Sequence, residues 1–239
     1  MRAMILQHTV TNPAGIYAEV LREHGATTTV VEVDDGEPIP RFDDFDAIVA
    51  MGGAMGVNDT EEFPWLLEEM RVIRDAARAG VPVWGACLGG QLLAASLGAR
   101  VFRMREPEIG FVPVELTQAA ADDAVFARLP RPFCAFQWHS DAFELPEGAV
   151  RLGGSGACAN QAFRWGANAY GVQFHLEATA DMVARWLEGS RNRAAVDRAL
   201  GAGGADRVLQ ELDRRGGEQT ENARILTERW IDQMTVGAT

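Results

Sequence analysis

The stretch Val83-Trp84-Gly85-Ala86-Cys87-Leu88-Gly89-Gly90-Gln91 decides the fold of this chain. An apolar run at residues 81–84 stops at a glycine, and residues 92–97 continue beyond two further glycines with a helix-like composition. This pattern predicts a strand that turns sharply into a helix, with Cys87 at the turn. Such a turn strains the backbone, and neighbours without side chains relieve the crowding. Because unpaired N–H groups and the dipole of a helix N-terminus favour a thiolate, Cys87 is a candidate nucleophile.

Strands and helices alternate on both sides of this turn. We expect strands at residues 3–8, 27–33, 47–51, 81–84 and 169–174, and helices at 14–24 and 64–79. This βαβ alternation predicts an α/β fold, in which a doubly wound, mostly parallel sheet of the flavodoxin-like kind carries helices on both faces.

The middle and the end of the chain have a different character. Short strand-like runs at 101–104, 110–116, 133–138, 149–152 and 161–164 predict a small antiparallel extension, with a short helix near 122–128. Beyond residue 179 we expect helices at 181–187, 206–214 and 222–234, separated by breaks at the glycine-rich segments 201–204 and 216–217. We therefore predict one domain over residues 1–190 and a helical extension, 191–239, packed on the same domain.

Composition limits the possible partners. The chain has 239 residues, 47% of them hydrophobic, and a formal net charge of −12, which argues against non-specific binding to nucleic acid or to an anionic membrane. No apolar run approaches the roughly 20 residues of a membrane span, and the N-terminus has the pattern of a strand rather than a signal peptide. Cys87, Cys134 and Cys158 fit neither a metal-ligand pattern nor a disulfide framework, so we expect a cytoplasmic location, no metal and no cofactor. Cys134 and Cys158 are expected in the core.

Three features at predicted strand ends suggest catalysis. Cys87 is the first. The second is His175 with Glu177, because residues i and i+2 of an extended segment point to the same side, so that the carboxylate can orient the imidazole toward a nucleophile. The third is Gly52-Gly53, whose unobstructed backbone N–H groups, together with that of Leu88, could stabilise an oxyanion. In a doubly wound sheet all three lie at the carboxyl ends of strands, where such folds place their sites.

The run 85–91 (GACLGGQ), together with 171–177 (GVQFHLE), resembles the class I, triad-type glutamine amidotransferases. The likeness extends from about residue 1 to 187 and is greatest to the stand-alone, GMP-synthase-like members, whose helical tail also fits this chain. Leu176 departs from the proline that many members have at that position. An extended leucine preserves the spacing of His175 and Glu177.

The resemblance implies a role for each matching residue. Cys87 would be the nucleophile, His175 the general base and acid and Glu177 its orienting partner, while Gly53 and Leu88 would form the oxyanion hole. Gln91 matches a position that helps to hold the amino-acid end of the substrate. The run 137–141 (QWHSD) resembles a loop near the pocket, which makes His139 and Asp141 candidate substrate contacts.

The implied reaction is hydrolysis of the glutamine side-chain amide through a Cys87 glutamyl thioester, which releases glutamate and ammonia. This chain shows no ATP-using domain with a Ser-Gly-Gly phosphate loop, so any ammonia acceptor would be a separate enzyme. Two alternatives stay open. A hydrolase of another γ-glutamyl amine or peptide would use the same chemistry with a different leaving group. A non-catalytic interaction protein on the same scaffold is the second alternative, against which the intact Cys, His and Glu set argues.

Overall fold

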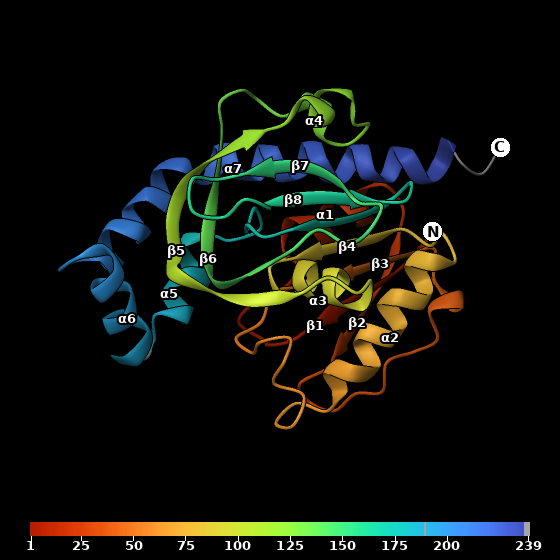
Figure 1. Ribbon diagram of the computed structural model, residues 1–239, viewed down its shortest axis with the longest axis horizontal. Helices are drawn as coiled ribbons and strands as arrows, with labels where there is room; N and C mark the ends of the chain where they lie inside the picture. The colour runs from red at the N-terminus through yellow and green to blue at the C-terminus, as the bar shows by residue number, and fades with distance from the viewer. Residues whose placement is uncertain (189, 237–239) are drawn as a thin grey trace.

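One nine-stranded sheet organises residues 1–188 and 190–236, the part of the chain that the computed structural model describes (Figure 1). Its strand order is β2-β1-β3-β4-β9-β8-β7-β5-β6. The first five strands are parallel, as the sequence predicts: β2 (Thr27–Glu32), β1 (Arg2–Gln7), β3 (Ala47–Ala50), β4 (Val83–Ala86) and β9 (Ala169–Val172).

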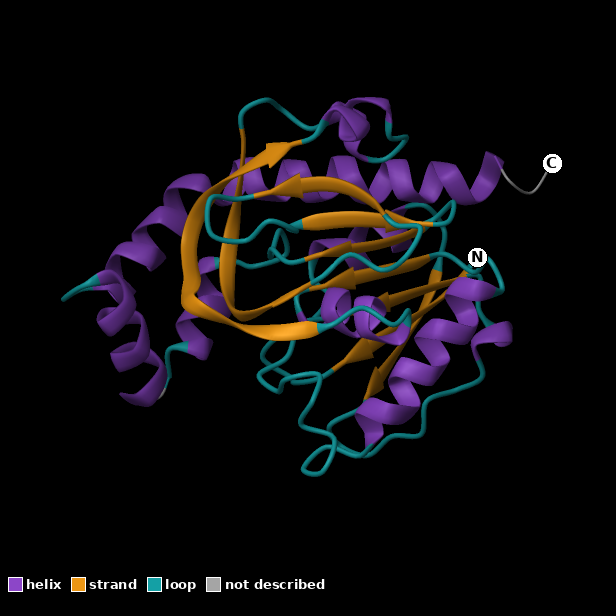
Figure 2. Ribbon diagram, in the orientation of Figure 1, coloured by secondary structure: helices purple, strands orange, loops and turns teal. Residues whose placement is uncertain are grey.

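Helices bury both faces of the parallel strands. In β1, Ala3 and Ile5 belong to one apolar core, whereas Met4 and Leu6 belong to the core on the opposite face. The first core is closed by α1 (Ile16–Glu23) and α7 (Gly204–Val236), and the second by α2 (Trp65–Arg78) and α3 (Leu88–Ser96) (Figure 2). Burial on both sides explains why β3, β4 and β9 are apolar along their whole length rather than alternating, whereas the edge strand β2 is partly exposed.

Two strands of the antiparallel extension, β5 and β6, are longer than the sequence predicts. It consists of β8 (Ala162–Trp165), β7 (Val150–Gly154), β5 (Val101–Leu116) and β6 (Phe133–Phe143). The two strands expected at 101–104 and 110–116 are one strand, β5, whose pairing with β6 shifts register between Arg103 and Glu108. The 137–141 segment, which resembles a loop, lies within β6. Pairing across a long two-stranded arm holds these polar segments in strands, although their local composition favours turns.

The helical segments between β5 and β6 are short. The helix expected near 122–128 is divided into α4 (Gln118–Asp122) and a 3₁₀ turn (Phe126–Arg128), and a further 3₁₀ turn (Phe42–Asp44) precedes β3. After β9 come α5 (Ala180–Trp186) and α6 (Ser190–Leu200). The sequence analysis did not assign α6 a range of its own.

The predicted helix break at residues 216–217 is wrong, because α7 runs through both glycines without interruption. Leu212 and Gln219, one on each side of the pair, are buried, and Gln219 accepts a hydrogen bond from Phe136 N–H and donates one to the Ala178 carbonyl, both at 3.0 Å. Tertiary packing therefore outweighs the low helix propensity of two glycines, about 1 kcal/mol each. None of the helices in the described residues has the length and apolar character needed to cross a membrane.

Candidate active site

Cys87 lies at the sharp turn between β4 and α3. Its φ of 50° is the only positive φ of a non-glycine among the described residues, and its N–H donates to the Val172 carbonyl at 2.8 Å. The turn requires glycines beside it: a Cβ on Gly89 would lie 2.0 Å from the Ala50 carbonyl oxygen, and one on Gly85 would lie 2.4 Å from the Gly89 oxygen. The predicted strand–turn–helix is confirmed, and it holds the Cys87 side chain at the first turn of α3.

His175 and Glu177 follow β9, the neighbour of β4 in the sheet. His175 Nδ1 lies 2.7 Å from Glu177 Oε1, and both side chains are almost completely buried. Burial alone would lower the pKa of His175, but the Glu177 carboxylate and the Cys87 sulfur raise it to about 10. The imidazole is therefore protonated at neutral pH and stabilises a negative charge on either side.

Cys87 and His175 meet in one cleft. A Cβ placed on Gly52 would lie 2.9 Å from His175 Cε1 and 3.5 Å from Cys87 Cβ, so the two side chains approach each other beside the end of β3. The strand ends of β3, β4 and β9 therefore assemble Cys87, His175 and Glu177 as the sequence predicts. The residues Cys87 and His175 line a cleft of about 710 Å³, as do Gly53 and Leu88.

Gly53 and Leu88 lie side by side at this cleft. A Cβ on Gly53 would come within 2.8 Å of Leu88 Cδ2. Leu88 is the first residue of α3, and no hydrogen-bond acceptor among the described residues faces its N–H or that of Gly53. Both N–H groups are free to bind an anion. Their role in an oxyanion hole stays a prediction.

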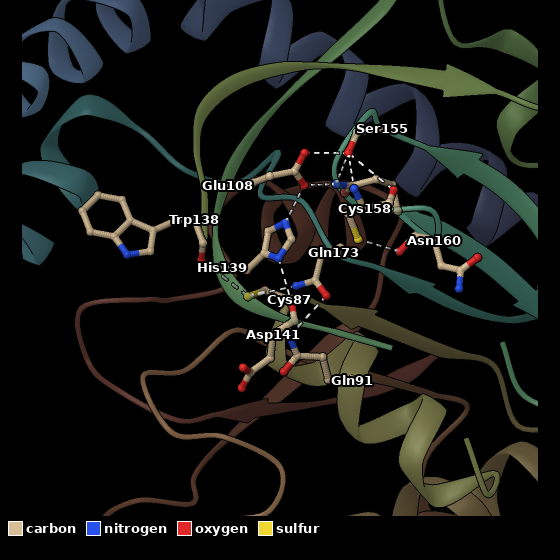
Figure 3. Close-up of polar contacts among 11 residues, drawn as sticks. Cys87, Gln91, Glu108, Trp138, His139, Asp141, Ser155, Cys158, Asn160 and Gln173 are labelled. Carbon is tan, nitrogen blue, oxygen red and sulfur yellow. Dashed lines mark hydrogen bonds and ion pairs between the residues drawn. The ribbon is translucent and has the colours of Figure 1, made fainter. Parts of the chain in front are cut away.

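A hydrogen-bond network joins Cys87 to β6 (Figure 3). Gln173 Nε2 lies 3.7 Å from Cys87 Sγ, and its Oε1 accepts from Gln91 Nε2 at 3.2 Å. Gln91 Nε2 also donates to the Asp141 carbonyl at 3.2 Å. Gln91 therefore orders the β6 segment that carries Asp141. The sequence analysis missed Gln173, although it stands two residues before His175 and alternation places it on the same side.

The His139 ring lies between the Asp141 carbonyl and a buried carboxylate, that of Glu108 (Figure 3). Its Nδ1 lies 2.9 Å from the Asp141 carbonyl and its Nε2 lies 3.0 Å from Glu108 Oε2. Glu108 also accepts from Ser155 Oγ and Gln161 Nε2, each at 2.6 Å. Burial would raise the pKa of Glu108, but the bonds from His139 and its other donors lower it. This arrangement makes His139 a support for the backbone at Asp141, and a direct substrate contact by its ring stays a prediction.

One group in the described residues brings metal-ligating atoms together. The ligand atoms of Glu108, His139 and Cys158 lie within 4.8 Å of one another. Hydrogen bonds already occupy the Glu108 oxygens, and burial raises the pKa of Cys158 to about 12, so that the sulfur is a thiol. Cys158 is buried, as expected, whereas Cys134 is partly exposed.

Charged and aromatic side chains complete the cleft. Asp141 pairs with Arg103 at 3.2 Å, and a Cβ on Gly56 would lie 3.2 Å from Asp59 Oδ2 and 3.5 Å from Asp141 Oδ2, so two carboxylates flank this glycine. The Trp186 ring of α5 also lines the cleft and meets the His175 ring edge-on, with the ring centroids 5.3 Å apart. Sequence analysis missed Trp186 and Arg103, because only the tertiary fold brings them to the cleft.

Comparison with known proteins agrees with this geometry. The family described as "Glutamine amidotransferase class-I" matches residues 16–185. The glutamine amidotransferase-like protein YfeJ of Salmonella typhimurium is 33% identical over 199 residues, 82% of this chain and 83% of that protein. A glutamine-hydrolyzing GMP synthase subunit from Thermoplasma volcanium is 34% identical over 160 residues, 66% of this chain and 74% of that protein. The crystal structure of a glutamine amidotransferase from Thermotoga maritima has a TM-score of 0.85 at 29% identity, and the match covers 97% of this chain and 98% of that one.

Proposed function

This chain belongs to the class I glutamine amidotransferase family, and from that premise we propose that it hydrolyses the side-chain amide of glutamine through a thioester on Cys87. The observation that carries the proposal is the meeting of Cys87, strained at a helix N-terminus, with a buried His175 that Glu177 orients. Nucleophile, base and orienting acid in this relation are what covalent acyl transfer requires.

The reaction has two steps. The Cys87 thiolate attacks the amide carbon, and the tetrahedral oxyanion accepts hydrogen bonds from Gly53 and Leu88 N–H, each worth about 3 kcal/mol in comparable sites. His175 gives its proton to the leaving nitrogen, so that the C–N bond breaks and ammonia departs. The imidazole then takes a proton from water as the water attacks the thioester. The C–S bond then breaks, glutamate leaves, and the released Cys87 thiolate with the protonated His175 restores the starting ion pair.

Release of glutamate from glutamine by the purified protein tests this proposal. Cys87→Ser and His175→Gln variants should each lose at least about 10²-fold in kcat/KM while remaining folded. An electrophilic glutamine analogue should label Cys87, as located by peptide mass spectrometry. Full activity of folded Cys87→Ser would refute the thioester mechanism.

A second candidate is hydrolysis of a γ-glutamyl amine or peptide. Ammonia needs no binding surface, yet the imidazole that would protonate the leaving group lies against Trp186, which itself packs on Trp138 at 5.7 Å. A cleft of about 710 Å³ lies within the range of about 300–1,000 Å³ that holds drug-sized ligands. An aromatic wall would favour an organic leaving amine by packing and by cation–π attraction.

Comparison of glutamine with γ-glutamyl amides of increasing bulk separates the two candidates. A kcat/KM that rises with the size of the amine, and that Trp186→Ala reduces selectively for the bulky amides, supports the second candidate. A kcat/KM that is highest for glutamine supports the first candidate, glutamine hydrolysis.

Partner, location and domain organisation complete the proposal. One relative is named as one subunit of a synthase, which supports a separate ammonia acceptor for this chain as well. A reactive Cys87 thiolate suits the reducing cytoplasm.

We also propose that residues 191–239 extend the same domain. Trp230 of α7 packs on Trp84, three positions before Cys87, with the ring centroids 5.9 Å apart, and Gln219 links β6 to Ala178. The last three residues, 237–239, lie outside the described part of the chain.

A further inference from the structure

Three polar atoms at and around the Glu177 carboxylate are buried without a hydrogen-bond partner among the described residues. They are Glu177 Oε2, the Tyr17 hydroxyl and the Trp84 indole Nε1. All three residues are at most 2% exposed. Native structures seldom leave a buried donor or acceptor unpaired, and here one acceptor and two donors occur together.

The three residues come from different elements that converge behind His175. Tyr17 lies in the first turn of α1, Trp84 in β4 and Glu177 after β9. The Tyr17 and Trp84 rings are 5.8 Å apart. A Cβ on Gly15, which immediately precedes α1, would lie 3.7 Å from Glu177 Cβ. The start of α1 therefore brings the Tyr17 side chain to the carboxylate.

The electrostatic surroundings of Tyr17 also indicate that its hydroxyl lies near the Glu177 carboxylate. Burial raises the pKa of Tyr17 well above its ordinary value, and the negative charge of Glu177 raises it further, while the nearby Trp84 side chain and Leu176 backbone oppose the rise. The hydroxyl keeps its proton at every physiological pH. It is therefore a permanent donor placed next to a carboxylate oxygen that has no other donor.

We propose that Tyr17 is a positioning residue of the triad, whose hydroxyl donates to Glu177 Oε2 directly or through one water, while the Trp84 N–H donates to the Tyr17 oxygen. This arrangement pairs all three orphan atoms. It also commits both oxygens of Glu177, since Oε1 already accepts from His175 Nδ1. The inference rests on the proposed function, because the ring that Glu177 orients is the general acid and base of that reaction.

The second hydrogen bond has a consequence for the pH dependence of the site. A buried carboxylate that loses a donor is less stable in its charged form and takes up a proton more readily. A protonated Glu177 would no longer hold His175 as an imidazolium, and Cys87 would lose the cation that favours its thiolate. The acid limb of Cys87 reactivity is the part of the pH profile in which the rate falls as the pH decreases. Removal of the Tyr17 hydroxyl should therefore move this acid limb to higher pH.

The chain offers a matched control for this test. It contains two tyrosines, and the ring of Tyr170 also packs on Trp84, at 6.0 Å. The Tyr170 hydroxyl bonds instead to Asp123, at 3.3 Å. Tyr17→Phe and Tyr170→Phe thus each delete a hydroxyl from a buried ring that packs on Trp84. Only the Tyr17 hydroxyl is next to Glu177.

The readout is the rate of alkylation of Cys87 by iodoacetamide as a function of pH, followed by peptide mass spectrometry. Tyr17→Phe should be about tenfold slower than the parent near pH 6, the factor that corresponds to about 1.4 kcal/mol, and should approach the parent rate near pH 9. Tyr170→Phe should keep the parent profile. An unchanged acid limb in Tyr17→Phe, or an equal shift in Tyr170→Phe, would overturn the proposal.

A second measurement does not depend on the stability of Tyr17→Phe. Incorporation of 3-fluorotyrosine in the Tyr170→Phe background modifies Tyr17 alone and makes its hydroxyl a stronger donor. The acid limb should then move to lower pH, and an unchanged limb would contradict the role of Tyr17. Alkylation requires no substrate, so the test separates the two proposals. A parent protein whose Cys87 resists alkylation at every pH would count against the proposed function. If Cys87 of the parent reacts but its acid limb does not move when Tyr17 is altered, the result would count against this inference alone.

Discussion

His175 Nδ1 and Glu177 Oε1 lie 2.7 Å apart in a pair that solvent hardly reaches. Burial would lower the pKa of His175, but the charge of Glu177 and the sulfur of Cys87 raise it to about 10. Glu177→Gln removes the charge and keeps the shape, so we expect the pKa of His175 to fall in this variant. NMR titration of the four histidine rings of the chain measures the change. An unaltered His175 titration would show that Glu177 does not hold the proton.

The same pair predicts how stability depends on pH. Because the folded-state pKa of His175 is above its unfolded value of about 6.5, its contribution is fully present below that pH and is lost as the pH rises toward 10. The comparison uses a Cys87→Ser background, which removes thiol ionisation. The free energy of unfolding of Cys87→Ser should be higher than that of the Cys87→Ser, Glu177→Gln double variant, and the difference should be largest near pH 6. The difference should shrink at higher pH in urea melts. A constant difference would contradict the ion pair.

Gly89→Ala should damage both stability and activity. The new Cβ would lie 2.0 Å from the Ala50 oxygen, and that oxygen belongs to backbone, which cannot turn aside as a side chain can. Overpacking of this kind costs about 1–3 kcal/mol, and the displaced turn would also move Cys87. Thermal melts and glutamine hydrolysis check the two effects. Parent-like values for both would show that the turn tolerates a side chain.

Gly216→Ala and Gly217→Ala should have the opposite effect. Both glycines lie inside α7, and a Cβ at either position meets no atom within 4 Å. Each substitution should stabilise the protein by about 0.5–1 kcal/mol, because alanine loses less backbone entropy in a helix. Activity should not change, and thermal melts should show an increase of a few degrees. A lower melting temperature would mean that the chain needs a flexible joint at this point.

The sequence predicts the parallel sheet and the meeting of Cys87 with His175 because each depends on short-range signals. Apolar runs mark β3, β4 and β9, and the residues at their ends are Gly52, Cys87 and His175. The continuity of α7 depends instead on partners distant in sequence, such as Phe136 and Ala178, which bond to Gln219. Likewise, His139 faces Glu108 only because β5 pairs with β6. No local pattern reveals such contacts.

Gln173→Met should reduce the reactivity of Cys87. Gln173 is completely buried, and its amide N–H faces Cys87 Sγ at 3.7 Å. Loss of one hydrogen bond to a charged group costs about 1.5–3 kcal/mol, and at this length we expect the lower end, about tenfold in kcat/KM. Gln137→Met is the matched control, since Gln137 is equally buried and its amide has no hydrogen-bond partner. Equal losses in both variants would indicate a packing effect rather than a contact with sulfur.

Asp141→Asn should weaken binding of the amino-acid end of the substrate. Asp141 and Asp59 place two carboxylates beside Gly56 at the cleft, where an ammonium group would find opposite charge. We expect KM for glutamine to rise about tenfold with little change in kcat. Glutaramic acid, which is glutamine without its α-amino group, should bind parent and variant equally, because the contact that the variant loses is absent from this ligand. Arg103→Gln is the companion variant: it removes the cation that competes for Asp141, so KM for glutamine should fall or stay constant. Equal weakening of both ligands by Asp141→Asn would mean that Asp141 shapes the cleft without touching the ammonium group.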